Sequence, residues 1–221
     1  MVFWRQLFNP GRMETNNYDA VASFYDPLSR LVFGKAQINA QVEQLKYVPT
    51  GARVLIVGGG TGWILEELAK VYPEGLNITY VEISRKMLDQ AQKRKVRRND
   101  VLFVHAAIEH FHPAEFFDVI ITAFLFDNFS QNKADLVFNH LDASLKVNGT
   151  WLFSDFKVNS KKQFGWKQLM LKMMYLFFRL LARVEAKKLA EVEALFKAKN
   201  YQIISRKAFY QGFIESIIFR K

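Results

Sequence analysis

One stretch of the chain decides the fold: residues 53–62, which read RVLIVGGGTG. The apolar run over 53–57 is too short for a helix and predicts a strand buried on both faces, as in a parallel sheet. The glycines that follow allow a tight turn with positive φ and a close approach of a ligand to the backbone. An amphipathic helix is expected from about Trp63 to Tyr72, and its N-terminus would offer free N–H groups to a carboxylate or phosphate.

The same alternation of strand and helix continues along the chain. Two helices are expected over 15–47. Further strands are expected over 77–82, 101–105, 117–123, 150–155, 201–206 and 215–220, and further helices over 84–96, 133–145 and about 164–199. This order predicts an α/β fold with a doubly wound sheet, in which the last two strands pair as an antiparallel unit.

The spacing of the glycines separates the possible ligands. Gly58, Gly60 and Gly62 form G-x-G-x-G rather than the G-x-G-x-x-G of dinucleotide sites, and no lysine follows the loop as in a P-loop. Glu82 ends the second expected strand, about 20 residues further on, where an acid accepts hydrogen bonds from ribose hydroxyls. Together these features predict a ligand that contains a nucleoside, rather than a glycine turn with only a structural role.

The sequence resembles the class I S-adenosylmethionine-dependent methyltransferases. Residues 54–62 match the first motif of that family, residues 80–84 with Met87, Leu88 and Ala91 match the second, and residues 117–121 match its fourth strand. Residues 145–150 resemble the turn before its fifth strand. Tyr18-Asp19, Ala22, Tyr25-Asp26 and the ending 213–221 resemble the ubiquinone/menaquinone-biosynthesis type.

The resemblance implies a Rossmann-like, seven-stranded, mostly parallel sheet with an antiparallel last strand and N-terminal helices. It further implies S-adenosylmethionine as cofactor and S-adenosylhomocysteine as product. Gly58, Gly60 and Gly62 would line the methionine part and Glu82 the ribose. The remaining contacts carried over from the family would be Ile83, Ala107 and Ile108 at the adenine, Thr122 and Ala123 at the sulfonium end, and Tyr25 closing over the site.

Two positions depart from the family pattern. Ile56 stands where an acid often precedes the first glycine, and Ala107 stands where an aspartate often contacts the adenine amino group. These departures leave open a catalytically silent relative that binds S-adenosylmethionine or serves as a scaffold. A short-chain-type oxidoreductase is disfavoured, because no Tyr-x-x-x-Lys pair follows the fourth expected strand.

Methyl transfer from a sulfonium requires alignment more than a fixed catalytic dyad. A general base is needed only where the acceptor must lose a proton. The candidates are Asp155, which ends the fifth expected strand, and Asp127, which follows the fourth.

Composition excludes several classes of site. Among 221 residues there is no cysteine, which excludes disulfides, cysteine–zinc sites and a thiol nucleophile, and with four histidines no metal is expected. The formal charge of +10 favours weak attraction to polyanions. The basic run over 93–98 has no aromatic platform near it in sequence, so a nucleic-acid partner or an RNA methyltransferase is the less favoured alternative.

The acceptor is expected to be small and apolar or aromatic. Residues 164–183 are expected to form a largely apolar helix with Lys172, Arg179 and Arg183 on one stripe, so this helix would be buried, paired in a homodimer or set on a membrane surface. We expect one methyltransferase domain over 1–221: an N-terminal helical cap (1–50), a cofactor-binding core (51–155), and lid helices with the last two strands (156–221). With no secretory signal in the first residues, the expected location is cytoplasmic, with membrane contact at the surface.

Overall fold

The computed structural model describes residues 18–20, 22, 25–157, 170 and 189–221. The helices of this part are η1 (Tyr18–Ala20), α1 (Tyr25–Phe33), α2 (Ala36–Val42), η2 (Leu45–Tyr47), α3 (Trp63–Val71), α4 (Arg85–Ala91), η3 (Ile108–His110), η4 (Phe126–Asn128), α5 (Gln131–Ser144), α7 (Val192–Ala198) and η5 (Tyr210–Gly212). The strands are β1 (Arg53–Val57), β2 (Glu74–Glu82), β3 (Arg98–His105), β4 (Phe117–Ala123), β5 (Leu145–Phe156), β6 (Gln202–Phe209) and β7 (Ile214–Arg220).

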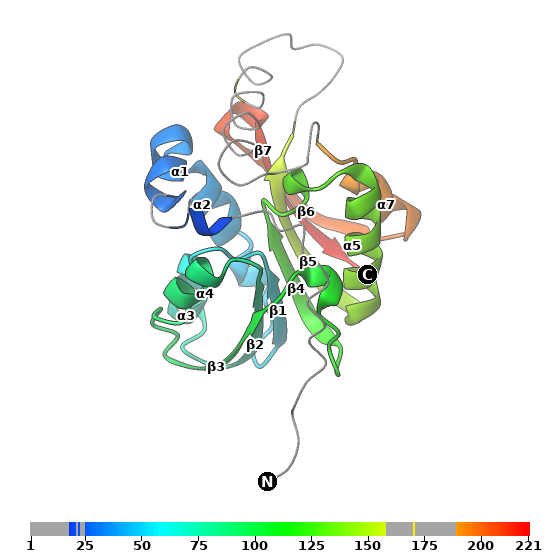
Figure 1. Ribbon diagram of the computed structural model, residues 1–221. Helices are drawn as coiled ribbons and strands as arrows, with labels where there is room; N and C mark the ends of the chain where they lie inside the picture. Colours follow the sequence, from blue (N-terminus) through cyan, green and yellow to red (C-terminus); the bar gives the residue numbers. More distant parts are fainter. Residues whose placement is uncertain (1–17, 21, 23–24, 158–169, 171–188) are drawn as a thin grey trace.

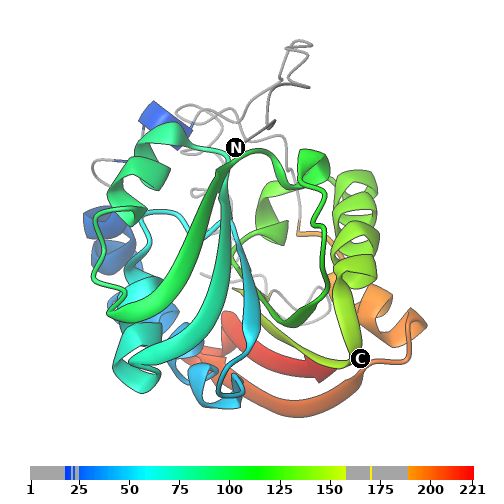
Figure 2. The same cartoon turned by 90° about the horizontal axis from the view of Figure 1, so that it is seen from below.

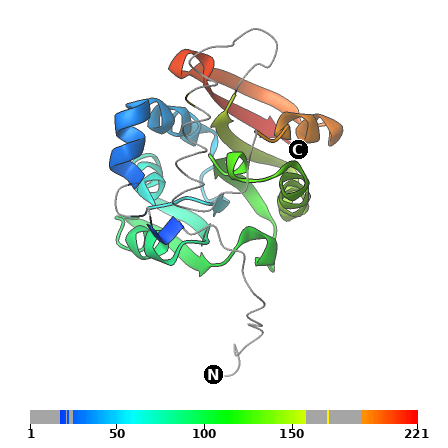
Figure 3. The same ribbon diagram turned by 45° about the horizontal axis from the view of Figure 1, so that its top comes forward.

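The strands form one seven-stranded sheet in the order β3-β2-β1-β4-β5-β7-β6. The first five pair in parallel, whereas β7 runs antiparallel to both β5 and β6. Figure 3 shows β6 and β7 side by side at one edge. The expected doubly wound, mostly parallel sheet with an antiparallel last strand is therefore confirmed. The strand order reverses at β1, so the crevice between the loops after β1 and β4 is the place where such sheets bind ligands.

Helices cover both faces of the sheet. In Figure 1, α3 and α4 lie on one side and α5 and α7 on the other. The side chains of successive residues alternate between the faces: Val54 and Ile56 pack with α3 and α4, and Leu55 and Val57 pack in the cluster of α5 and α7. Figure 2 shows the twist of the sheet, with α5 beside α7. This burial on both faces explains why β1 is a continuous apolar run.

The N-terminal helices are fixed to the sheet by buried polar contacts. Gln44 is 1% exposed, and its Nε2 donates to the carbonyl oxygen of Phe153 over 2.7 Å. Ser216 on β7 donates to the carbonyl oxygen of Ala40 at 2.8 Å. These bonds hold α2 and η2 over the end of the sheet at which the site lies.

Several boundaries differ from the sequence expectation; β2 and β3, for example, begin earlier than expected, at Glu74 and Arg98. The helix expected over 84–96 ends at Ala91, and Arg97 has a positive φ of 56°. The strand expected over 150–155 begins at Leu145, because the chain pairs with β4 from Phe117↔Leu145 through an irregularity before Thr150. Most of the expected helix over 164–199 lies outside the described residues, except for Met170 and the segment from 189.

Candidate functional site

The glycine loop joins β1 to α3 in a conformation that needs glycine. Gly58 and Gly60 have φ values of 65° and 62°, a region that side chains rarely adopt. The amide of Gly58 donates to the carbonyl oxygen of Val81 at 2.9 Å. The hydroxyl of Tyr80 donates to the carbonyl oxygen of Gly60, also at 2.9 Å. The loop is therefore attached to β2 along its length.

Two further glycines are required by packing. A Cβ on Gly59 would lie 2.4 Å from the Tyr80 hydroxyl oxygen, and a Cβ on Gly62 would lie 2.5 Å from the Cβ of Ala91 on α4. Gly62, with a φ of 79°, also precedes the first turn of α3. The glycine pattern thus combines close packing at Gly59 and Gly62 with more space at Gly60, whereas a Cβ on Gly58 would lie 3.0 Å from the side chain of Leu125.

Glu82 lies at the end of β2 and lines the cavity beside this loop. One carboxylate oxygen accepts the amide N–H of Gly60 at 3.0 Å, and the other accepts that of Ser84 at 2.8 Å. Burial raises the pKa of the Glu82 carboxyl, although both backbone N–H groups favour its ionised form. The hydrogen bond from the glycine loop therefore orients this carboxylate, which faces the cavity rather than solvent.

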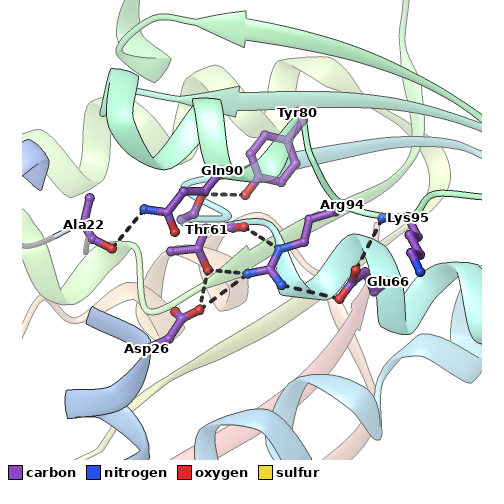
Figure 4. Close-up of polar contacts among 9 residues, drawn as sticks. Ala22, Asp26, Thr61, Glu66, Tyr80, Gln90, Arg94 and Lys95 are labelled. Atoms are coloured by element: carbon purple, nitrogen blue, oxygen red, sulfur yellow. Dashed lines mark hydrogen bonds and ion pairs between the residues drawn. The ribbon is translucent and has the colours of Figure 1, made fainter. Parts of the chain in front are cut away.

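A polar network ties the N-terminal segment to the loop (Figure 4). The Thr61 hydroxyl donates to Asp26 on α1 at 2.8 Å. The Arg94 Nε donates to the Thr61 carbonyl oxygen at 2.9 Å, and the Arg94 guanidinium also reaches Glu66 on α3 at 3.4 Å. Gln90 on α4 donates to the carbonyl oxygen of Ala22 at 3.2 Å. Ala22 and Asp26 of the N-terminal segment therefore form part of a cover over the glycine loop and α4.

One cavity of about 680 Å³ runs from the glycine loop to the aromatic side of α1 and α2. This is a usual volume for a small-molecule site. Its wall contains polar backbone at the loop and three phenylalanines at the other end. The ring centroid of Phe156 lies 5.3 Å from that of Phe33 and 4.9 Å from that of Phe124. We call these two regions the cofactor end and the acceptor end.

Most of the residues expected from the sequence line this cavity. They are Gly58, Gly60, Glu82, Ile83, Ala107, Ile108, Ala123 and Asp127. The binding role of each remains a prediction. Tyr25 begins α1, but its side chain lies outside the described residues.

Three of the expected residues do not line the cavity. Thr122 is 1% exposed and accepts a hydrogen bond from the Trp151 indole at 2.8 Å, because alternation along β4 turns its side chain into the core. Gly62 packs against α4. Asp155 lies behind the cavity wall, where its carboxylate accepts the N–H of Phe156 at 2.8 Å.

Several cavity residues escaped the sequence analysis. Gln37, Ile38 and Gln41 come from α2, and Asn128 comes from η4. Asn128 accepts a hydrogen bond from Tyr18 and donates one to Asp127 at 2.8 Å. Only the amphipathic pattern of the N-terminal helices could have suggested the α2 contribution, since no motif marks it.

Two other kinds of feature are missing from the described part of the chain. No three histidine, aspartate or glutamate side chains come together there as metal ligands would. The helices in the same ranges are all too short or too polar to span a bilayer.

The chain is similar in sequence to known methyltransferases. Residues 54–149 match the family model described as a methyltransferase domain. Over 140 residues the chain is 31% identical to a malonyl-[acyl-carrier protein] O-methyltransferase of Bacillus cereus, covering 63% of this chain and 51% of that protein. Over 92 residues it is 30% identical to a ubiquinone/menaquinone biosynthesis C-methyltransferase of Geotalea daltonii, covering 40% of this chain and 39% of that protein. The matched part of the chain therefore spans about half of the first relative's length and about two fifths of the second's.

A solved structure with a similar fold is the N-methyltransferase NodS of Bradyrhizobium japonicum in complex with S-adenosyl-L-homocysteine. The TM-score is 0.68 at 16% identity, with 93% of this chain and 98% of the other covered. At this identity the likeness shows the Rossmann-like methyltransferase fold alone.

Proposed function

We propose that this chain, which belongs to the class I S-adenosylmethionine-dependent methyltransferases, transfers a methyl group to a small apolar or aromatic acceptor. One observation carries the proposal: a single cavity joins the glycine loop and Glu82 to the aromatic end at Phe124 and Phe156. A cofactor bound at the first end would present its methyl group toward a ligand held at the second.

The cofactor end offers groups suited to each part of S-adenosylmethionine. The loop backbone at Gly58 and Gly60 would hold the methionine part, and the Glu82 carboxylate would accept the ribose hydroxyls. Ile83, Ala107 and Ile108 would enclose the adenine, and Ala123 would face the sulfonium. The contacts of Ile83 and Ala107 with the adenine would be apolar or through the backbone. Affinity for the adenine would therefore depend on how closely its shape fits the cavity.

The acceptor end supports transfer by positioning. The sulfonium is an activated donor whose leaving group is neutral, so the protein has chiefly to align acceptor, methyl and sulfur, an effect worth up to about 7–11 kcal/mol. Aromatic walls from α1, the turn after β4 and the end of β5 would orient a flat, apolar acceptor by stacking and edge contacts.

A carboxylate acceptor on an acyl chain is a second candidate. The name of the Bacillus cereus relative includes malonyl-acyl-carrier protein as substrate. In this chain Arg30 on α1 and Lys133 on α5 also line the cavity, although Lys133 pairs with Glu109 at 3.0 Å. Two cations beside an apolar wall suit an acidic group on an apolar chain.

The test is mass spectrometry of the purified protein for bound S-adenosylhomocysteine, followed by methyl transfer to a panel of quinols, phenols, amines and a malonyl thioester. We expect bound product and transfer to an aromatic acceptor. Transfer to the malonyl thioester alone would favour the second candidate. Tight cofactor binding without transfer to any acceptor would indicate a silent binding protein, and failure to bind the cofactor would refute the proposal.

A further inference from the structure

Two buried glutamines from α2 line the acceptor end of the cavity. Gln37 and Gln41 are each 8% exposed, and both belong to the cavity wall. They stand four residues apart in a helix, so their side chains leave the same side of α2 one turn from each other. Glutamine is rarely buried unless its amide has hydrogen-bond partners. The partners of these two amides therefore indicate what this side of α2 can bind.

Each amide uses one end within the protein. The Nε2 of Gln41 donates to the backbone carbonyl oxygen of Gln37 at 3.3 Å. Because a carbonyl oxygen only accepts, this bond fixes the orientation of the Gln41 amide and leaves its Oε1 on the other side. The Oε1 of Gln37 accepts the hydroxyl of Ser29 on α1. The end of the Gln37 amide that remains is its NH2 group.

The two remaining ends have no partner among the described residues. Neither the Oε1 of Gln41 nor the Nε2 of Gln37 takes part in a hydrogen bond there. The one side-chain polar atom in those ranges that lacks both a partner and accessible surface is the Oγ of Ser154, so the two amide ends are accessible. Since both glutamines are buried and line the cavity, the space that these ends reach is the cavity. The two amides thus offer a ligand one acceptor oxygen and one donor group, with no charge.

The two amides lie beside the aromatic wall. Ser29 and Phe33 are one turn apart on α1, so they share one side of that helix. Ser29 bonds Gln37, and the ring centroid of Phe33 lies 5.3 Å from that of Phe156. A flat ligand packed against these rings could therefore reach the two amides with a group on its edge.

The aromatic wall is held in an unusual backbone conformation. Phe124 has a φ of 53°, a region that bulky side chains rarely adopt, and such strain persists only where surrounding contacts impose it. Its N–H donates to the carbonyl oxygen of Ser154 at 2.8 Å, and its own carbonyl oxygen accepts the Nδ2 of Asn128 at 2.9 Å. These contacts fix the Phe124 ring beside Phe156 as part of the cavity wall.

No buried cation accompanies the amides at this end in the described part of the chain. Arg30 is exposed on α1, and Lys133 pairs with Glu109 at 3.0 Å. Burial raises the pKa of Asp127, which lines the cavity, well above its usual range, and it raises the pKa of Asp155 behind the wall to about 7. A carboxylate acceptor would lie beside these buried acids without a buried cation to stabilise it. An uncharged group suits this surface better.

We propose that Gln37 and Gln41 bind an uncharged group on the ring of the acceptor, a group that both donates and accepts hydrogen bonds, such as a hydroxyl or a carboxamide. The inference rests on the proposed function and narrows its acceptor to a neutral aromatic ring of this kind rather than a carboxylate. The Oε1 of Gln41 accepts the O–H or N–H of that group, and the Nε2 of Gln37 donates to its oxygen. An acceptor without the group would leave both amides unpaired, which is how buried polar side chains discriminate between ligands.

The experiment measures the binding of four ring compounds to the protein saturated with S-adenosylhomocysteine, by titration of naphthyl fluorescence at pH 7. All four are substituted at the same ring position. Naphthol and naphthamide carry a neutral group that donates and accepts, methoxynaphthalene carries one that only accepts, and naphthoate carries a carboxylate. We expect the first two to bind about tenfold more tightly than the other two, because methoxynaphthalene leaves an amide unpaired and naphthoate buries a charge.

Two variants assign this preference to the glutamines. Gln37→Met and Gln41→Met remove the amides and keep an unbranched side chain of similar length. Each should lower the affinity for naphthol and naphthamide about tenfold and change that for methoxynaphthalene much less. Affinity for S-adenosylhomocysteine should stay the same. The matched control is Asn39→Leu, which removes an exposed amide on the same helix outside the cavity wall and should change none of these affinities.

Each outcome decides a different point. If methoxynaphthalene or naphthoate bound as tightly as naphthol, the inference would fail, and this comparison needs only the wild type, so it holds even where a variant does not fold. If Gln37→Met and Gln41→Met weakened all four compounds alike, the glutamines would have a structural role only, and the inference would fail as well. The same conclusion follows if none of the four compounds binds while S-adenosylhomocysteine does. Failure to bind S-adenosylhomocysteine would instead refute the proposed function.

Discussion

The two ends of the cavity are built from different kinds of sequence. Apart from Ala123 at the end of β4, the cofactor end comes from one continuous stretch, about 57–108, and consists of backbone N–H groups, a buried acid and small apolar side chains. The acceptor end is assembled from α1, α2, the turn after β4 and the end of β5, which are spread along the chain from Tyr25 to Phe156. The first can therefore be identified from a motif, whereas the second exists only once the sheet has formed.

The largest expected effect tests whether close packing against α4 is what requires glycine at position 62. Gly62→Ala should lower the free energy of unfolding by about 2–5 kcal/mol, since the new Cβ would overlap Ala91 and the backbone has a positive φ. Gly51→Ala is the matched control, because it has a similar φ of 73° with nothing within 4 Å. Urea denaturation would measure both.

Gly51→Ala should lower the free energy of unfolding by only about 1–2 kcal/mol, because only its backbone conformation is unfavourable. If the two variants were equally destabilised, the close approach of α4 would contribute nothing and the backbone conformation alone would explain the glycine. In either case the acceptor end should keep its shape, because neither residue lines the cavity.

The next prediction tests the cofactor end alone, by measuring affinity for S-adenosylmethionine. Glu82→Ala should weaken binding of S-adenosylmethionine roughly tenfold to a hundredfold, the loss of a charged hydrogen bond of about 1.5–3 kcal/mol. Glu74→Ala, at the exposed start of the same strand, is the control and should leave affinity unchanged. Isothermal titration gives both values, and unchanged affinity in Glu82→Ala would remove that residue from the site.

The fold and the cofactor end could be predicted because local patterns encode them. The run over 53–57, its glycines and Glu82 gave strand, turn and acid in the correct order, and the observed sheet follows. Arg94 was expected only as part of a basic helix end. Instead α4 ends at Ala91 and Arg94 turns back to bond Thr61, a contact set by tertiary packing rather than by helix propensity.

The acceptor end could not be predicted in the same way. Asp127 and Asp155 were candidates because both follow strands, but the sequence gives no indication that one lines the cavity while the other lies behind it. Thr122 and Ala123 show the same limit: they are neighbours on β4, and alternation sends one to the core and leaves the other at the cavity. The lid expected over 164–183 lies, apart from Met170, outside the described residues.

A smaller effect concerns pH and stability at the acceptor end. The raised pKa of Asp155, about 7, lies above the value of about 3.9 in an unfolded chain, so the folded state binds that proton more tightly. This stabilisation is complete below about pH 4 and is lost as pH rises through about 7. Between pH 6 and pH 8 the free energy of unfolding of the wild type should fall by on the order of 1–2 kcal/mol more than that of the double variant Asp127→Asn/Asp155→Asn. If both proteins changed equally in free energy of unfolding between the two pH values, as measured by denaturation, the raised pKa of Asp155 would be contradicted.

The smallest effect tests whether α2 belongs to the acceptor end alone. Ile38 is partly exposed and lines the cavity, so Ile38→Ala should raise KM for an aromatic acceptor several-fold, a loss of about 1 kcal/mol of apolar contact. Affinity for S-adenosylmethionine should stay the same, because the cofactor end draws nothing from α2. Leu136→Ala, exposed on α5 and outside the cavity wall, is the control for a general loss of apolar surface. A parallel fall in cofactor affinity would mean that the two ends are coupled through the cover formed by the N-terminal segment, and the division of the cavity into independent ends would no longer hold.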